Sequence, residues 1–158
     1  MGIQKMLGTR VLYEFGKDIA KIVRMVMDSN IGINKKSGKN TLSDSNIYKQ
    51  LSVISTNDGD LVFDIMLNDY ITFIENGRRQ GAKMPPVEPI VRWAREHGIP
   101  TDNSTIYLIR RAISRDGIQP RPIMATVFKE LDNEWQSDWS DRLFNIIIEQ
   151  IDKFFNNG

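Results

Sequence analysis

The sequence predicts an α+β fold in which helices pack on a small antiparallel sheet. Apolar residues recur every three or four positions through most of the chain, which is the period of a helix with one buried face. The stretch 50–67 departs from this period, because two β-rich runs flank the turn sequence Asn57-Asp58-Gly59 and together predict a hairpin. A chain of 158 residues can bury a sizeable core, so we expect a single domain over residues 1–158.

The N-terminal part predicts one long helix and then a loop. Over residues 9–28, Thr9 can cap a helix, and an apolar stripe follows it at helical spacing. We expect this helix to pack on the sheet, with a coiled-coil seam as the alternative. Residues 29–40 are rich in Asn, Gly, Ser and Lys, which predicts a flexible basic loop, and residues 41–47 predict a short turn or a helix start.

The predicted hairpin has strands at 50–56 and 60–67. Its three aspartates, Asp58, Asp60 and Asp64, could be drawn as metal ligands. Aspartate, however, favours hairpin turns through its local hydrogen bonds, and the spacing of a calcium-binding loop does not follow. We therefore predict no metal site here.

A basic loop follows the hairpin. Residues 69–76 carry an apolar ridge, as a strand or a short helix, and Asn76-Gly77 ends it. The loop beyond is loosened by Gly77 and Gly81 and closed by Pro85-Pro86, and its basic residues are Arg78, Arg79 and Lys83. We predict that this loop presents positive charge at a fixed place.

The second half of the chain predicts helices at 87–97, 103–115, 123–136 and 141–156. The first two form a pair that occupies residues 87–115. Before the third, Pro120-Arg121-Pro122 predicts an extended elbow that holds Arg121 outward.

The final helix has a wide apolar face, which predicts that it is either deeply buried or part of a subunit contact. Trp135 and Trp139 lie in an acidic setting just before it, and we predict that both are exposed aromatic anchors of an interface. Phe154 and Phe155, at its end, extend the predicted subunit interface.

The sequence lacks the residue patterns of common catalytic sites. It has no cysteine, and its single histidine, His97, falls at the end of a predicted helix. No glycine-rich loop continues into Lys-Ser/Thr, and the zinc-protease and serine-hydrolase motifs are missing. A metal-dependent nuclease can be drawn from Asp64, Glu75 and Lys83, but such sets arise by chance. We predict no enzyme activity, no catalytic residue and no cofactor.

Hydropathy and charge bear on the surroundings of the chain. No apolar run reaches the roughly 18 residues of a membrane span and no secretory signal is evident, so we expect a soluble protein made in a cytosol, without a membrane partner. Residues 1–50 and 78–122 are net basic, whereas 51–77 and 123–158 are net acidic. Such blocks can form opposite patches that meet between neighbouring subunits, or can arise by chance.

Several segments occur in an order that characterises one family. They are the long N-terminal helix, the basic loop, Thr41-Leu42-x-x-Ser45-x-Ile47, the hairpin, Tyr70-Ile71-x-Phe73-Ile74-Glu75-x-Gly77, and Pro120-Arg121-Pro122-Ile123-Met124. Over residues 9–135 the chain resembles the neck and tail-completion proteins of tailed bacteriophages, a tail-component family. That family typically has Gly-x-Leu-x-x-Ser-Ile, Tyr-Ala-x-x-Val-Glu-x-Gly and Pro-x-Pro-Phe-Leu segments.

The stretch Lys83-Met84-Pro85-Pro86-Val87 with Trp93 is similar to the longer variants in gut phages of the crAss-like group. The chain departs from the family pattern where Asn40 replaces a glycine, where Arg78 replaces a small residue, and where Ile123-Met124 replaces Phe-Leu. The helix pair 87–115 is an insertion relative to the compact family core.

The resemblance implies a non-enzymatic virion structural protein of the phage neck, assembled in the host cytoplasm. Copies would form a hexameric or dodecameric ring in the head–tail connector, next to portal-side and tail proteins, and packaged double-stranded DNA would pass through it. Arg78, Arg79, Lys83 and Arg121 would then face either the DNA channel or a neighbouring subunit. We expect Arg121→Glu and Gly77→Val to block particle completion and to leave the monomer folded. The alternative is a nucleic-acid-binding accessory protein that uses the basic residues of 78–121.

Overall fold

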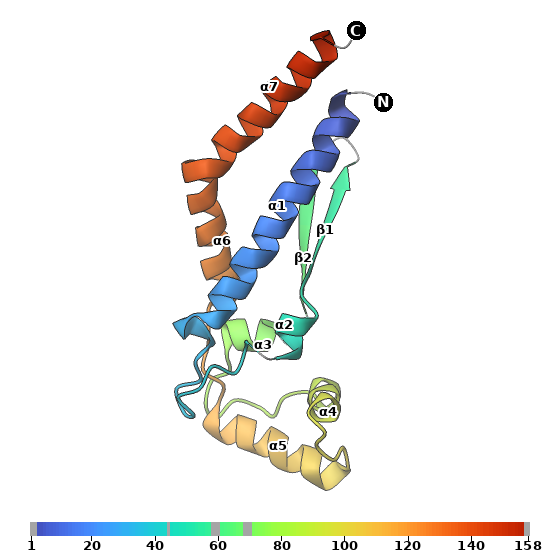
Figure 1. The fold of residues 1–158 in the computed structure, drawn as a ribbon. Coiled ribbons are helices and arrows are strands. Elements are labelled where there is room, and N and C mark those ends of the chain that lie inside the picture. Colours follow the sequence, from blue (N-terminus) through green and yellow to red (C-terminus); the bar gives the residue numbers. More distant parts are fainter. Residues whose placement is uncertain (1–2, 44, 58–60, 68–70, 157–158) are drawn as a thin grey trace. The chain divides into compact units, whose positions relative to one another are not determined.

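A computed structural model describes residues 3–43, 45–57, 61–67 and 71–156 of the chain (Figure 1). Over these ranges the protein is mostly helical and contains one two-stranded antiparallel sheet. The predicted α+β class is therefore confirmed.

The chain divides into two compact units. The first unit comprises Met1–Val26, Leu51–Met66 and Met124–Gly158, and the second comprises Met27–Gln50 and Leu67–Ile123. Each unit is therefore assembled from segments that are separated in the sequence. Because the two sets of segments interleave along the chain, the division does not test the single domain expected over 1–158, which stays a prediction.

The first unit contains most of α1 (Ile3–Asp28), the hairpin and a C-terminal helical run (Figure 1). The hairpin pairs β1 (Ser52–Asn57) with β2 (Leu61–Met66), as predicted, with Val53 opposite Ile65 and Ser55 opposite Phe63. Residues 58–60 of the predicted turn, which include Asp58 and Asp60, lie outside the described residues. α1 begins at Ile3, not at residue 9, since the chain is already helical before Thr9.

The C-terminal run consists of α6 (Ile123–Glu134), the π-helix η2 (Trp135–Trp139) and α7 (Ser140–Asn156). The core of the first unit forms where this run, α1 and the hairpin meet. Its buried residues are Val11, Phe15, Ile19, Ile22, Trp139 and Ile146, with partly buried Val53, Phe63, Ile65, Leu131 and Leu143 packed against them. The rings of Phe15 and Trp139 meet edge to face, with centroids 5.1 Å apart. The helical stripe predicted for the N-terminal helix therefore packs on the sheet and on the C-terminal run.

Charged residues tie α1 to the C-terminal run beside this core. Arg142 of α7 donates hydrogen bonds to Asp18 (2.7 Å) and Glu14 (3.4 Å) of α1 and to Asp138 of η2 (3.2 Å). Arg10 pairs with Glu14 at 3.0 Å and also with Glu149 of α7. The Arg142 guanidinium also lies 5.0 Å from the centre of the Phe15 ring. The three carboxylates around Arg142, with Asp18 contributing most, raise the pKa of its guanidinium.

The second unit contains the 3₁₀ helix η1 (Asn30–Gly32), α2 (Asn46–Lys49) and α3 (Ile71–Asn76). The stretch for which a strand or a short helix was predicted is thus a helix. The predicted pair 87–115 is present as α4 (Val87–Glu96) and α5 (Asn103–Asp116). Three buried residues form the core between them, Ile90, Ala94 and Ile106. The standing of this pair as an insertion remains a prediction.

The loop predicted over 29–40 is closed by backbone and side-chain hydrogen bonds. Ile33 and Asn40 form an isolated antiparallel bridge, and the Asn34 N–H donates to the Lys39 carbonyl at 2.9 Å. The Asn40 side chain donates to the Met27 carbonyl and accepts from the Leu42 N–H, both at 2.8 Å. Asn40 thereby joins the two ends of the loop. Its flexibility stays a prediction.

Candidate functional site

The basic loop after α3 is held against the segment that precedes α6. The Arg78 N–H donates to the Ile118 carbonyl at 2.7 Å, and the Ile118 N–H donates back to Arg78 at 2.8 Å. Glycines flank this bridge, Gly77 with φ 63° and Gly117 with φ 72°. A Cβ on Gly77 would lie 2.5 Å from the Ile118 carbonyl oxygen, and one on Gly117 would lie 2.5 Å from the Arg78 oxygen. Both positions therefore require glycine, for backbone conformation and for space.

This geometry corrects the expectation that Gly77→Val leaves the monomer folded. A valine would bring a β-branched side chain to a positive φ and into contact with backbone atoms of Ile118 and Pro120. Gly77 is a packing position of the second unit, and a loss of function in that variant would not isolate an assembly role.

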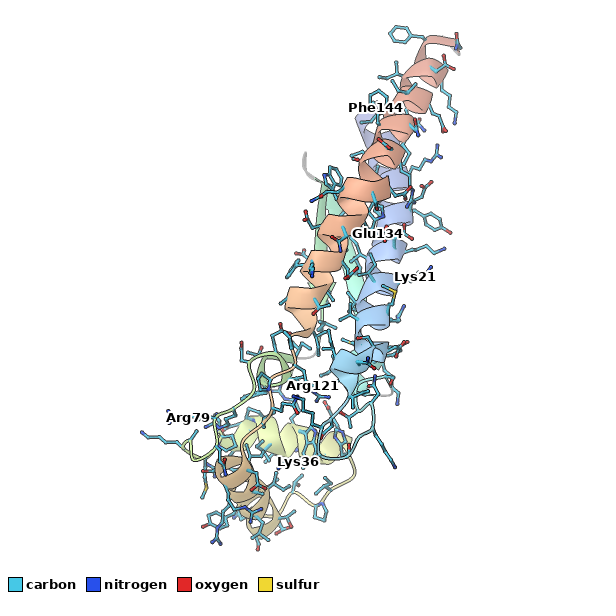
Figure 2. All side chains as sticks on the ribbon, turned by 90° about the vertical axis from the view of Figure 1, so that its left-hand side faces the viewer. Lys21, Lys36, Arg79, Arg121, Glu134 and Phe144 are labelled. Carbon is cyan, nitrogen blue, oxygen red and sulfur yellow. The ribbon has the colours of Figure 1, made fainter. Side chains whose placement is uncertain are left out.

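The three basic residues of the loop have different surroundings. Arg78 is half-buried: its Nη2 donates to the Lys83 carbonyl, and its Nε is buried without a hydrogen-bond partner among the described residues. Arg79 and Lys83 are exposed, and Figure 2 shows the Arg79 side chain pointing away from the chain. The loop thus presents Arg79 and Lys83 outward, as predicted, whereas Arg78 serves the packing of its own unit.

Arg121 was predicted to point outward, and this prediction is wrong. Its Nη1 donates to the Gly32 carbonyl and to Thr41 Oγ1, each at 2.9 Å, and its backbone N–H donates to the Ile74 carbonyl at 2.8 Å (Figure 2). The elbow is extended, but its backbone pairs with the end of α3. That pairing places the guanidinium beside oxygen atoms of the loop 29–40 and of Thr41. Arg121→Glu would put a carboxylate against these acceptors, so it should perturb the fold as well.

Other arginines of the predicted basic set also bond within the chain. Arg110 Nε donates to the Pro85 carbonyl at 2.6 Å. Arg115 pairs with Asp116 at 2.8 Å, and this bond lowers the pKa of the Asp116 carboxyl. Arg78, Arg110 and Arg121 therefore bond to other segments of the second unit, whereas Arg115 pairs with its neighbour in the sequence.

The four predicted interface aromatics divide into an exposed pair and two others. Trp135 is 48% exposed and Phe155 is 74% exposed, as expected of contact residues. Trp139 is only 7% exposed and belongs to the core with Phe15, so the expectation that it is an exposed anchor is wrong. Phe154 lies in α7, and its side chain falls outside the described ones.

α7 presents a row of exposed apolar side chains that the sequence alone does not distinguish from its buried face. The row has spacings of four, three and four residues and consists of Phe144 (61% exposed), Ile148 (49%), Ile151 (39%) and Phe155 (74%). We name it the α7 row. Leu143, Ile146 and Gln150 lie on another side of the helix, where Ile146 and Gln150 are buried. The helix therefore has two apolar faces, and only one of them is covered in the described part of the chain.

The described residues contain no group of three or more His, Cys, Asp or Glu side chains suited to hold a metal ion. Within the described helices, no stretch combines the length and the apolar character that a bilayer crossing requires. Comparisons with protein-family models, with curated protein sequences and with solved structures give no match for this chain.

Proposed function

We propose that this chain is a structural subunit that associates with further copies of itself through the α7 row. We further propose that the assembly is the closed ring of a tailed-bacteriophage neck, the role that the sequence resemblance implies. The α7 row is the single observation that carries the proposal. Spacings of four and three residues form the seam along which one helix packs against another, and a protein that remains monomeric rarely exposes so continuous an apolar surface.

The energetics indicate how large the contact must be. Complete burial of one Phe or Ile side chain stabilises by about 1.5–3 kcal/mol, so the partly exposed α7 row would supply roughly 5 kcal/mol. This gain only matches the low end of the cost of bringing two proteins together. A stable contact therefore needs more surface, and Phe128 and Trp135 of the same helical run are the next exposed apolar side chains.

A ring requires each subunit to offer two different surfaces, because a head-to-tail contact closes only when unlike flanks meet. Basic and acidic residues are concentrated in different segments of this chain, which supports unlike flanks. The exposed Arg79 and Lys83 are available to a neighbouring carboxylate or to DNA phosphates. In a channel that DNA must traverse, such contacts would be weak and independent of base sequence.

Light scattering at low and moderate salt tests the proposal, together with electron microscopy of the assembled particles. We expect a discrete hexamer or dodecamer with a central opening. Ile148→Glu places a carboxylate in the α7 row and should raise the concentration needed for assembly by about a hundredfold or more, because burying an unpaired charge is costly. Asn145→Glu adds the same charge to an exposed position of α7 outside the row, and we expect it to assemble normally.

Two results would contradict the proposal. One is a wild-type protein that stays monomeric at every concentration and salt condition. The other is an assembly that Ile148→Glu and Asn145→Glu leave equally intact. The alternative, a nucleic-acid-binding accessory protein, predicts that a monomer binds DNA with an affinity that falls steeply with salt. Because Arg78, Arg110 and Arg121 form hydrogen bonds within the chain, less exposed positive charge is available for DNA binding than the sequence predicts.

A further inference from the structure

The second unit contains a cavity of about 580 Å³ between α3, the helix pair α4–α5 and the segment before α6. Five apolar residues from these helices account for much of its wall: Ile74, Ile90, Trp93, Ile109 and Ile113. Its volume falls within the usual range of small-molecule sites, about 300–1,000 Å³. A neighbouring cavity of about 400 Å³ shares four of its lining residues, Asn34, Ile74, Trp93 and Arg121.

The polar part of this wall is predominantly basic. Lys36, Arg78 and Arg121 line the larger cavity, and Asp116 is the one acidic residue in its wall. Lys36 Nζ lies 3.9 Å from Asp116 Oδ2, and 76% of the lysine side chain is exposed. An ion pair this long and this exposed is weak, so it compensates little of the positive charge.

Arg78 adds a specific donor to this charge. Its Nε is buried and has no hydrogen-bond partner among the residues that the structure describes. Nε is closed to a water-sized contact, so the remaining N–H groups of the planar guanidinium, on a residue that lines the cavity, would bind a carboxylate or phosphate. The other end of the guanidinium is already anchored, because Nη2 donates to the Lys83 carbonyl. The arginine is thus oriented before any ligand arrives.

We propose that this cavity binds a small amphipathic anion, with a flat apolar body against the isoleucines and Trp93 and one carboxylate or phosphate group at Arg78. The apolar wall accounts for the body, and the excess of basic side chains accounts for the charge. Every lining residue lies between Asn34 and Arg121, so this site uses none of the residues of the α7 row. It is therefore independent of the proposed assembly role.

Isothermal titration of the full chain with three probes that share one apolar body tests this site. The probes are 2-naphthoate, 2-naphthyl phosphate and the neutral 2-naphthamide. We expect at least one of the two anions to bind with about one molecule per chain and at least about tenfold more tightly than the amide, since charge-assisted hydrogen bonds are the strong ones. The tighter of the two anions identifies the head group that the site prefers.

Matched variants locate the binding. Arg78→Met keeps an apolar stem and removes the donor, and it should reduce anion affinity to the level of the amide. Arg79→Met removes the neighbouring exposed arginine and should leave the affinity unchanged. Ala112, in the cavity wall on α5, provides a test that leaves every charge in place: Ala112→Met should fill the space and weaken all binding by about tenfold or more. This variant decides the matter if Arg78→Met does not fold by circular dichroism.

The proposal would be overturned by no binding of either anion, by equal affinity for the anions and the amide, or by equal losses in Arg78→Met and Arg79→Met. Unchanged binding in a folded Ala112→Met protein would also place the ligand elsewhere and overturn it.

Discussion

The contact between Gly77 and the segment before α6 gives the sharpest stability prediction. In Gly77→Ala the new Cβ would lie 2.5 Å from the Ile118 carbonyl oxygen and 2.6 Å from the Pro120 nitrogen. Ordinary contacts of a Cβ begin near 3.4 Å, so the two segments must separate by roughly 1 Å. That movement acts directly on the two hydrogen bonds between Arg78 and Ile118.

Gly81→Ala separates the backbone cost from the cost of the clash. Gly81 has φ 77° and Gly77 has φ 63°, so both substitutions place an alanine in the left-handed region, at about 1–2 kcal/mol. Around Gly81 no atom lies within 4 Å of the added Cβ. Gly77→Ala also weakens two backbone hydrogen bonds, each worth about 1 kcal/mol. We therefore expect a loss of about 3–4 kcal/mol for Gly77→Ala, against about 1–2 kcal/mol for Gly81→Ala.

Urea unfolding followed by far-ultraviolet circular dichroism, at one fixed protein concentration, measures this difference. Gly117→Ala provides an independent check, because its Cβ would meet the Arg78 oxygen from the other side of the same bridge. We expect its loss to match that of Gly77→Ala. Equal losses for Gly77→Ala and Gly81→Ala would refute the reasoning, since they would mean that residues 77 and 118 do not approach each other this closely.

Three further predictions concern single side chains. Trp139→Ala removes a core residue and should lower the free energy of unfolding by about 3–5 kcal/mol in urea melts. Trp135→Ala should change the free energy of unfolding by less than about 1 kcal/mol and should weaken assembly. Similar losses of stability in the two variants would contradict the assignment of Trp139 to the core. Arg121→Met removes two hydrogen bonds and should cost about 1–3 kcal/mol, measured in the same way, and a neutral effect would contradict its inward placement. The hydrogen bond from Arg10 lowers the pKa of the Glu14 carboxyl in the folded state. The stability that ionised Glu14 contributes is therefore present above the ordinary pKa of about 4.3, and it disappears as the pH falls through the lower pKa of the folded state. Thermal melts in steps below pH 5 should therefore show a smaller loss in Glu14→Gln than in the wild type, and parallel curves would exclude the linkage.

The secondary structure was predictable because its signals are local. The turn sequence at Asn57-Asp58-Gly59 and the β-rich runs beside it specify a hairpin without reference to the rest of the chain. Similarly, Asp102 caps α5 by accepting from the Thr105 N–H at 3.0 Å, and Gly117 ends that helix at a positive φ. At the start of α1 the local signal is misleading, because Thr9 is a suitable cap, yet the helix runs through it from Ile3.

The surroundings of the arginines were not predictable in this way, because their partners are far away in the sequence. Two prolines around Arg121 indicate an extended backbone, but they do not tell which side of that backbone faces the rest of the unit. The direction is decided by the Ile74 carbonyl and by the acceptors on Gly32 and Thr41. Likewise, the glycine before Arg78 predicts a flexible backbone, whereas in the structure Gly77 permits close packing against Ile118.

The π-helix explains why the two tryptophans differ although they are only four residues apart. In α6 the inward side passes through Val127 and Leu131, and continued α-helical spacing, seven residues beyond Leu131, would bring Asp138 inward. η2 takes up one extra residue, since the Ser140 N–H bonds to the Trp135 carbonyl five positions earlier. The inward position therefore passes to Trp139, and Asp138 is left exposed, where it pairs with Arg142.

The same shift fixes the outward face of α7. Once Trp139 lies in the core, Ile146 and Gln150 follow it inward at spacings of seven and four, and the apolar residues Phe144, Ile148 and Ile151 are left on the exposed side. A continuous α-helix would rotate α7 by roughly 100° about its axis and would bury a different set of residues. The row on which the assembly proposal rests is therefore a consequence of the π-helix. Deleting the exposed residue Gln136 removes the extra residue together with the π turn, so a continuous α-helix would still place Trp139, Ile146 and Gln150 inward. We therefore expect the core around Phe15 and the assembly to persist in this variant, and loss of either in the folded protein would contradict the argument from register.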